Sequence, residues 1–443
     1  MEQALQKLMP YFIQFSNFKI IKALKNGFIR TVPFTLIGSV FLLIADIPIT
    51  GYDAFMAGIF GANWTEPLYK VTGATFDILA VFTAFTLAYE YCNDEGLDGV
   101  PAGLFGISGL FIMTANSVTT AAGELVGSAV PLAWLGGKGL IAAMISSLLA
   151  GMIYTWFIKK DIRIKLPESV PPAVANSFSA LIPGCVILTV YAALHLLASY
   201  ALSMTVTEAI YYWLQVPLQN LTDSLPGVVI VALLISIFWW CGIHGDAIVT
   251  TGIMSPILNS NMLENQAIID AGGTLVAGEN AKIVTEQFML FIKMGGAGCT
   301  MGLILCMIFF SKSKQMKQLG KLGLGPSLFN INEPLIFGTP IIFNPIMIIP
   351  FILVPTANAI IAYLVILSGW VPPFTGLVVP WTLPAVLSGL ILGGWKTAAL
   401  QAALIGLSFV IYFPFFKAHD KMLVETEKAF EEQNEEQNEE QED

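Results

Sequence analysis

Long apolar stretches separated by short polar segments run along most of the 443-residue chain. Stretches of about twenty residues with few charges are long enough to cross a lipid bilayer as helices. The pattern therefore predicts an all-α polytopic membrane protein with about ten transmembrane helices. The predicted spans, in chain order, cover residues 27–47, 73–92, 101–115, 139–158, 176–201, 226–243, 299–311, 346–367, 385–394 and 397–416.

The first residues follow a different pattern, in which apolar side chains recur at helical spacing with lysines between them. The apolar positions of residues 4–25 are Leu5, Leu8, Phe12, Phe15, Phe18, Ile21 and Leu24. A helix with one apolar face and one lysine-rich face lies in the membrane interface, and lysines favour the anionic cytoplasmic leaflet. We therefore expect an interfacial amphipathic helix over residues 1–26.

The apolar pattern is broken at residues 329–345, where three prolines fall within twelve residues. Each proline removes a backbone donor and clashes with the preceding turn, so a regular helix does not form there. Irregular backbone at membrane depth is tolerated only where protein buries it or where it lines a polar cavity, and in transporters such breaks mark binding sites. Asn332 and Glu333 are therefore candidate site residues. A surface loop with a solvated glutamate is the alternative.

A second polar cluster ends the apolar run 226–243 and contains Trp239, Trp240, His244 and Asp246. An indole ring offers an apolar face to the C–H face of a sugar, whereas imidazole and carboxylate groups form hydrogen bonds with hydroxyls. An aromatic belt at the membrane interface is the alternative, but a belt does not require the glycines that flank His244. The cluster therefore favours a sugar site.

Two further breaks carry candidate residues. Gln287 precedes the glycine-rich sequence 295–298, and dense glycines are typical of a re-entrant hairpin or of close helix contacts. Trp381 lies between Pro380 and Pro384 and is a candidate for a third aromatic residue at the site. An interfacial anchor is an equally good interpretation of Trp381.

Composition supports a membrane protein, because 56% of the residues are hydrophobic and 12% are charged, against about 25% charged in soluble domains. Of the net charge of -10, most lies in residues 425–443, which hold ten acidic residues and one lysine. Such a self-repelling repeat predicts a disordered, dispensable cytoplasmic tail over 421–443. The nearly neutral remainder gives no indication of nucleic-acid binding.

The five cysteines lie in or beside apolar runs, without a CxxC spacing or nearby histidines. They predict packing residues, with no disulfide framework, metal site or cofactor. The N-terminus has no pattern of a cleavable signal peptide. Basic residues at 159–165 and 417–421 predict cytoplasmic ends, so both termini are expected inside.

The lysines between 312 and 321 raise a conflict, because strict alternation of the spans places them outside. A re-entrant hairpin or an additional crossing between 246 and 298 resolves the conflict, and the sequence leaves both open.

The two broken segments also resemble one known family. The motifs are Asn332-Glu333-Pro334, Phe337-Gly338-Thr339-Pro340, Asn344-Pro345, and Phe238-Trp239 followed by Gly242-Ile243-His244-Gly245. They are similar to the sugar permeases of the bacterial phosphotransferase system, specifically the enzyme IIC subunits of the lactose, cellobiose and diacetylchitobiose branch. The resemblance implies uptake of a β-linked disaccharide such as one of these, with phosphorylation by the phosphocysteine of an enzyme IIB partner.

The resemblance further implies a homodimer in the bacterial plasma membrane. Residues 27–215 are then the scaffold and dimerisation half, and residues 216–420 the sugar-binding half. Because no soluble stretch is long enough to carry a phosphocysteine, enzyme IIB is expected to be a separate chain. The implied catalytic residues are His244 and Glu333. The implied substrate-binding residues are Trp239, His244, Asp246, Gln287, Asn332, Glu333 and Trp381.

Two other functions fit the same residues. In an ion-coupled secondary sugar transporter, protonation of Glu333 or His244 drives uptake, and in an intramembrane enzyme the two act as acid and base. Buried carboxylates and histidines suit all three functions, because a low-dielectric site shifts their pKa values. The chain has no HExxH or Gly-x-Ser-x-Gly motif, and the resemblance favours the phosphotransferase permease.

Overall fold

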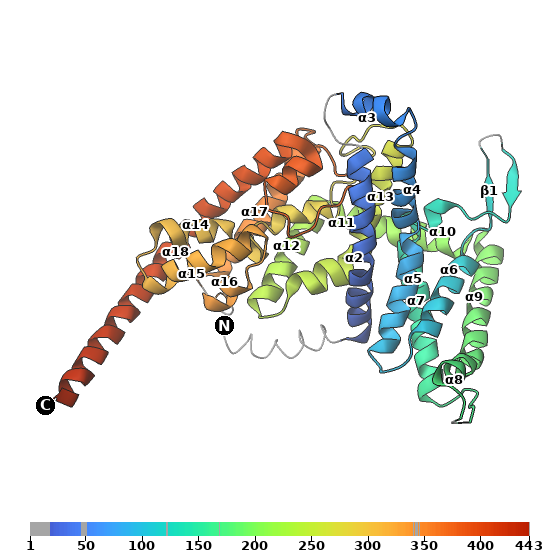
Figure 1. Cartoon of the computed structure of the whole chain (residues 1–443), viewed down its shortest axis with the longest axis horizontal. Coiled ribbons are helices and arrows are strands. Elements are labelled where there is room, and N and C mark those ends of the chain that lie inside the picture. Colours follow the sequence, from blue (N-terminus) through green and yellow to red (C-terminus); the bar gives the residue numbers. More distant parts are fainter. Residues whose placement is uncertain are drawn as a thin grey trace.

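The computed structural model of the protein describes residues 18–45, 51–120, 123–167, 169–339, 341, 344 and 346–442. Its regular elements are helices apart from one short hairpin. Two groups of helices lie side by side, one from the N-terminal part and one from the C-terminal part of the chain (Figure 1). The predicted predominantly helical architecture is confirmed.

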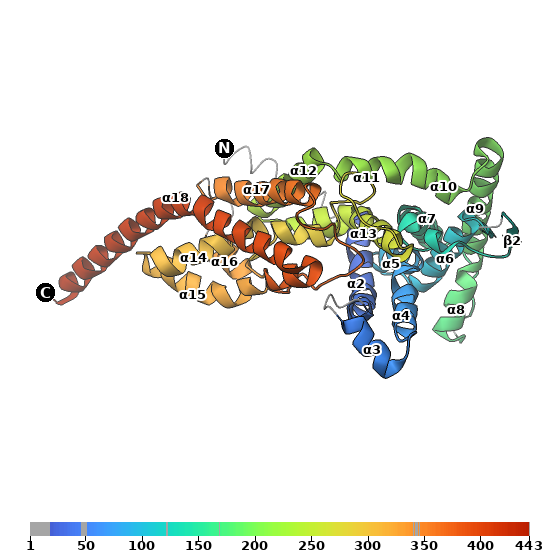
Figure 2. The same cartoon turned by 90° about the horizontal axis from the view of Figure 1, so that it is seen from above.

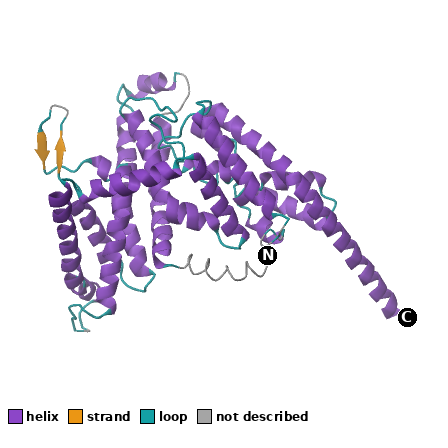
Figure 3. Ribbon diagram, turned by 180° about the vertical axis from the view of Figure 1, so that it is seen from behind, coloured by secondary structure: helices purple, strands orange, loops and turns teal. Residues whose placement is uncertain are grey.

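The first group runs from residue 19 to residue 202. Its elements are α2 (Lys19–Ala45), α3 (Tyr52–Phe60), α4 (Glu66–Phe76), α5 (Leu79–Asn93), α6 (Val100–Met113), β1 (Ser117–Thr119), β2 (Leu125–Gly127), η1 (Leu132–Trp134), η2 (Gly137–Gly139), α7 (Leu140–Lys159), α8 (Pro172–Ser179) and α9 (Leu181–Leu202). The strands pair antiparallel, with Val118 opposite Val126. Figure 3 shows this hairpin projecting from one end of the group.

A short series of helices connects the two groups, namely α10 (Val206–Ile210), η3 (Tyr211–Gln215) and α11 (Val216–Thr222). It begins with a capping box, in which Thr205 and Glu208 satisfy each other's backbone N–H groups. Figure 2 shows it crossing from α9 towards the second group. The chain then bends by 78° into α12.

The second group holds the remaining elements. They are α12 (Leu225–Trp240), η4 (Ala247–Met254), α13 (Ser255–Asp270), η5 (Gln287–Ile292), η6 (Ala297–Cys299), α14 (Met301–Phe310), α15 (Lys314–Leu328), α16 (Glu333–Gly338), α17 (Ile348–Leu367) and α18 (Leu387–Glu442). One apolar core joins α12, η5, α14, α17 and α18, and it fully buries Phe288, Phe351 and Tyr412.

Six helices in the described part of the chain are long and apolar enough to span a membrane, and two bent helix pairs raise the number to eight. The predicted count of about ten is therefore not confirmed. The predicted spans 385–394 and 397–416 lie within α18, where non-helical backbone at Gly393 and Gly394 separates two helices. The predicted span 101–115 corresponds to α6, whose 14 residues reach only about 21 Å at 1.5 Å per residue.

The polar composition of residues 259–284 is typical of a connection outside the membrane, but their first part belongs to the buried helix α13. Asn261 donates to the carbonyl oxygen of Val284 at 2.7 Å, and Asn265 donates to that of Phe374 at 2.8 Å. Both asparagine side chains are fully buried. The polar sequence of α13 therefore reflects internal hydrogen bonding and not exposure to water.

At the N-terminus only the last part of the predicted amphipathic helix is described, whereas the C-terminal tail differs from the sequence-based expectation. Most of the predicted amphipathic helix, residues 1–17, lies outside the described residues, and residues 19–25 begin the continuous helix α2. The tail expected to be disordered continues α18 as a helix to Glu442 (Figure 1). Glutamate and glutamine have high helix propensity, which the charge-based argument left out.

Candidate functional site

A glycine-rich turn, residues 294–300, lies at the centre of the candidate site and is called the glycine turn below. Gly295, Gly296 and Gly298 have positive φ angles of 77°, 96° and 74°. A Cβ atom at Gly296 would lie 2.2 Å from Cγ of Asn332, and one at Gly298 would lie 2.3 Å from the Phe351 ring. Only glycine fits these two positions, because both the backbone conformation and the space exclude a side chain.

Asn332 binds the glycine turn with its whole side-chain amide. Its Oδ1 accepts from the Ala297 N–H at 3.2 Å, and its Nδ2 donates to the Ala297 carbonyl and to Oγ1 of Thr300, each at 2.7 Å. The side chain is only 3% exposed. Asn332 thus fixes the start of α16 against the turn, which positions the next residue, Glu333.

Asn330 is a functional candidate that sequence reasoning missed. Its Oδ1 accepts from the Gly295 N–H at 2.9 Å, and its Nδ2 donates to the carbonyls of Trp381 and Leu383 at 2.7 and 3.1 Å. Asn330 therefore joins the glycine turn to the segment that carries Trp381. Its left-handed backbone, with φ of 61°, is tolerated better by asparagine than by most residues.

Glu333 is the first residue of α16 and is half-buried. Its Oε2 is buried and has no hydrogen-bond partner among the residues that the structure describes. The same holds for Oε2 of Glu286, which directly precedes the predicted site residue Gln287. Buried oxygens without partners carry a free-energy cost that a ligand hydroxyl relieves by donating to them.

Trp239, His244 and Asp246 lie together, as their spacing predicts. The indole Nε1 of Trp239 donates to Oδ2 of Asp246 at 3.1 Å, and the Trp239 and His244 rings are 4.3 Å apart between centroids. His244 is exposed, and its Nδ1 accepts from the Ala247 N–H at 3.1 Å. A neutral imidazole then carries its proton on Nε2 and presents a donor to a ligand.

The two adjacent tryptophans have different environments, which the sequence could not distinguish. Both residues are buried, with Trp239 6% and Trp240 4% exposed, but Nε1 of Trp240 donates to the carbonyl of Asn344 at 3.2 Å. Trp239 instead faces His244. Trp239 is therefore the better candidate for a sugar contact, whereas Trp240 joins α12 to the segment before α17.

Lys293 is a second residue that sequence reasoning missed. Its Nζ lies 2.9 Å from Oδ1 of Asp246, and the two side chains are 17% and 16% exposed. The sequence did contain a signal, because a single lysine in the apolar run 288–294 needs a buried partner.

Gln287 and Trp381 are the remaining predicted residues, and both belong to the same region. Gln287 is 3% exposed, and its Oε1 accepts from the Val379 N–H at 3.2 Å. Trp381 is 56% exposed, and its carbonyl accepts from Nδ2 of Asn330. All the predicted site segments are thus connected to residues 286–300 by hydrogen bonds or ion pairs.

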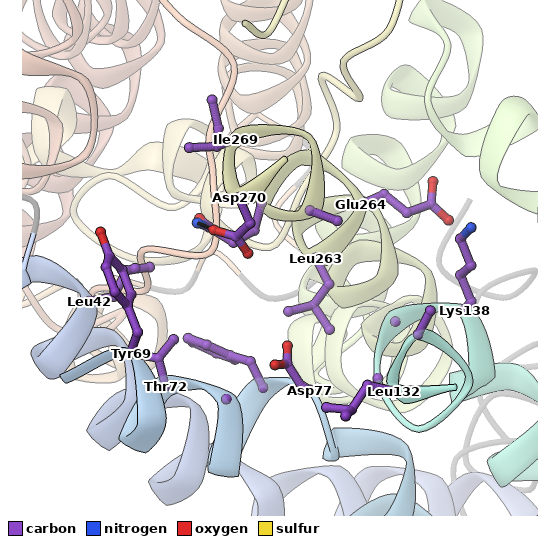
Figure 4. Close-up of a pocket in the computed structure, with 17 residues that line it drawn as sticks. Leu42, Tyr69, Thr72, Asp77, Leu132, Lys138, Leu263, Glu264, Ile269 and Asp270 are labelled. Atoms are coloured by element: carbon purple, nitrogen blue, oxygen red, sulfur yellow. Dashed lines mark hydrogen bonds between the residues drawn. The ribbon is translucent and has the colours of Figure 1, made fainter. Parts of the chain in front are cut away.

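A separate cavity of about 650 Å³ lies between α4, η1, η2 and α13. Figure 4 shows Tyr69, Asp77 and Lys138 on the side of the first group, and Glu264 and Asp270 on α13. None of the predicted site residues lines this cavity. It marks the boundary between the two groups of helices.

Comparison with known proteins places the chain among sugar permeases. A family model described as "Phosphotransferase system, EIIC" matches residues 25–355. The chain is 39% identical to the cellobiose-specific EIIC component of Geobacillus stearothermophilus, over 96% of this chain and 94% of that protein. It is 30% identical to the lactose-specific EIICB component of Staphylococcus haemolyticus, over 97% of this chain and 72% of that protein.

A solved structure agrees with these sequence comparisons. The fold matches the crystal structure of the transporter ChbC, the IIC component from the N,N'-diacetylchitobiose-specific phosphotransferase system, with a TM-score of 0.90 and 38% identity. The match covers 96% of this chain and 98% of that chain. The similarity predicted from two short motifs therefore extends over almost the whole length.

Proposed function

Because the chain belongs to the EIIC family of the bacterial phosphotransferase system, we propose that it takes up a β-linked disaccharide and presents it to an EIIB protein for phosphorylation. The similar proteins are named for cellobiose, lactose and N,N'-diacetylchitobiose. All three are candidate substrates. Competition by each sugar against labelled cellobiose uptake distinguishes among them.

The proposal rests on Glu333, whose buried Oε2 has no hydrogen-bond partner in the described part of the chain, and on the rigid support that Asn332 and the glycine turn give this residue. A carboxylate held in this way accepts a hydrogen bond from a sugar hydroxyl without reorganising, and such charge-assisted bonds are about twice as strong as neutral ones. Trp239 offers an aromatic face for the sugar ring.

The proposed transfer divides the chemistry between Glu333 and His244. The phosphoryl group moves from the sulfur of the EIIB phosphocysteine to a sugar hydroxyl oxygen, so the S–P bond breaks, an O–P bond forms and a thiolate leaves. Glu333 takes the hydroxyl proton, because its carboxylate is the acceptor. His244 donates from Nε2 and orients the reacting oxygens.

The charge of the product favours its release. Phosphorylation adds about -1.5 to -2 charges, and the predicted site holds the carboxylates Asp246, Glu286 and Glu333 with Lys293 as a counter-charge. A phosphosugar is therefore repelled from a site that holds the neutral sugar. The same repulsion opposes rebinding of the product.

A separate EIIB protein is the proposed phosphoryl donor. We place the exposed lysines of α15, Lys314, Lys317 and Lys321, on the cytoplasmic face. There they attract an acidic phosphoprotein.

The organisation of the permease is proposed on the same basis. Residues 27–215 form the scaffold and dimerisation half of a homodimer, and residues 216–420 bind the sugar. The chain lies in the plasma membrane with both termini in the cytoplasm, as the basic segments 159–165 and 417–421 indicate.

The test is uptake of radiolabelled cellobiose into vesicles that contain the purified protein. We expect phosphorylated sugar to accumulate when phosphorylated EIIB is supplied on the cytoplasmic side, and no concentrative uptake without it. Glu333→Gln protein serves as the control for leakage. Accumulation of unmodified sugar under a proton or sodium gradient alone would overturn the proposal in favour of ion-coupled transport.

A further inference from the structure

The proposed phosphotransfer step assigns no role to the ion pair between Lys293 and Asp246. Among the residues that the structure describes, Lys293 has no hydrogen bond or ion pair with Glu333 or His244, and its pair with Asp246 is mostly buried. A buried ion pair contributes little net stability compared with apolar side chains of similar size, because both charges lose their hydration. Its presence next to Trp239 and His244 therefore calls for a role in geometry.

Asp246 connects Lys293 to the aromatic pair. One carboxylate oxygen, Oδ1, receives Nζ of Lys293 at 2.9 Å and Oγ1 of Thr250 at 3.4 Å. The other, Oδ2, receives the indole N–H of Trp239 at 3.1 Å. Because both oxygens are occupied, the carboxylate has one orientation, and it fixes the Trp239 ring against His244.

Lys293 is itself held by the glycine turn. Its carbonyl oxygen accepts from the Gly296 N–H at 2.8 Å. Gly296 is adjacent to Ala297, whose N–H and carbonyl are bound by Asn332. A short series of contacts thus runs from Glu333 through Asn332 and the glycine turn to Lys293, and onwards through Asp246 to Trp239 and His244.

We propose that Lys293 is a positioning residue that sets the place of Trp239 and His244 relative to Glu333. It acts through Asp246 and needs no contact with the sugar. The inference rests on the proposed function, since its consequence is measured as phosphotransfer. Glu286, which also interacts electrostatically with Lys293, keeps the lysine in a site of net negative charge.

The expected consequence is a change in turnover larger than the change in sugar affinity. Misplacing a reacting group by about 1 Å costs up to about 100-fold in rate. Lys293→Met therefore lowers phosphotransfer at saturating sugar and EIIB by about 10- to 100-fold, while the dissociation constant for cellobiose rises less. Lys293→Arg restores part of the turnover, because arginine also pairs with a carboxylate.

The decisive measurement is a double-mutant cycle between Lys293→Met and Trp239→Phe, which keeps an aromatic ring but removes the donor to Asp246. If Lys293 acts through Asp246 and Trp239, the two effects on turnover are far from additive. Additive effects, or wild-type turnover in Lys293→Met, overturn the proposal. Lys282→Met is the control, because Lys282 bonds Asn220 at an exposed position in the same half.

Two further results must be told apart from failure of this inference, namely a variant that does not fold and a wild-type protein that does not catalyse phosphotransfer. If Lys293→Met does not assemble, the variant Lys293→Met with Asp246→Asn removes both buried charges and is used in the same assays. Reduced turnover with retained cellobiose binding supports the inference, and wild-type turnover overturns it. If the wild-type protein yields no phosphosugar with EIIB, that result contradicts the proposed function and is not a test of the positioning role of Lys293.

Discussion

At the scale of single residues, the structure separates groups that are free to meet a ligand from groups that hold other residues in place. Glu333 keeps a buried oxygen without a partner in the described part of the chain, and His244 keeps one ring nitrogen directed away from its backbone bond. By contrast, both the oxygen and the nitrogen of the Asn332 side-chain amide form hydrogen bonds with the glycine turn. The predicted site residues therefore include groups that can bind a ligand and groups that hold other residues in place.

Glu333→Gln is expected to lower uptake of labelled disaccharide by at least about tenfold, because the neutral amide forms weaker hydrogen bonds and takes no proton. Glu279→Gln, which changes an exposed glutamate in the same half, should behave as wild type. Normal uptake in Glu333→Gln would remove this residue from the site.

His244→Ala is expected to lower phosphotransfer turnover by about 100-fold, the usual cost of losing one hydrogen-bond donor at a reacting group. Sugar affinity, measured by equilibrium binding, should fall much less. The control is His195→Ala, on α9 of the first group. Equal losses of affinity and turnover would make His244 a binding residue only.

At the scale of elements, the glycine turn and the C-terminal helix have roles that their composition did not reveal. The turn accepts no Cβ at Gly296, because Asn332 fills that space. Three backbone or hydroxyl donors at the start of α15, from Ser313, Lys314 and Gln315, bind the Glu427 carboxylate of α18 at 2.7 to 3.1 Å. Part of the acidic tail thus caps another helix.

Gly296→Ala is expected to abolish sugar binding and to lower the melting temperature, because it displaces Asn332 and strains a backbone with φ of 96°. Gly406→Ala in α18 is the matched control. A Cβ there meets nothing within 4 Å, and alanine stabilises a helix by about 1 kcal/mol relative to glycine. Sugar binding by Gly296→Ala at wild-type affinity would show that the turn is not part of the site.

The effect of tail truncation on stability is expected to depend on where the chain ends. This expectation replaces the simpler one, that the whole tail is dispensable. A chain ending at Phe430 keeps Glu427 and should transport normally. A chain ending at Met422 loses this cap, at a cost of about 1 kcal/mol, and should show a lower melting temperature. Equal melting temperatures for the two chains would show that the cap does not contribute.

At the scale of the whole molecule, the predicted site lies in the second group of helices, and that group contacts the first through α13 and η4 (Figure 1). Secondary transporters expose a site to each side by moving one rigid part against another, and we expect the same movement between these two groups of helices. A cross-link between the groups should therefore stop transport without removing the site.

The pair Ile21→Cys and Gly252→Cys tests this expectation, because a Cβ at Gly252 lies 3.8 Å from Cγ2 of Ile21. In a background with Cys185, the exposed native cysteine, changed to alanine, oxidation should block uptake but leave sugar binding. Reductant should restore uptake, and each single cysteine variant should be insensitive to oxidation. Unchanged uptake by fully cross-linked protein would contradict movement at this boundary.

The sequence by itself determined the membrane class, the family and most of the candidate site. Hydropathy over windows of about twenty residues reports the cost of burying charge in a bilayer, which is a local property. The motifs around Trp239, His244 and Glu333 are also contiguous in the chain. These features are therefore visible without knowledge of the fold.

Only the tertiary structure decided which polar groups pair with one another and which remain free. The partners of Asn332, Trp240 and Asp246 lie in distant segments, as when Trp240 donates to Asn344 across 104 positions of the chain. It also decided that polar α13 is buried and that the helix of α18 continues to Glu442. The physical reason is that a buried polar group is stable only with a partner, and packing of distant segments supplies that partner.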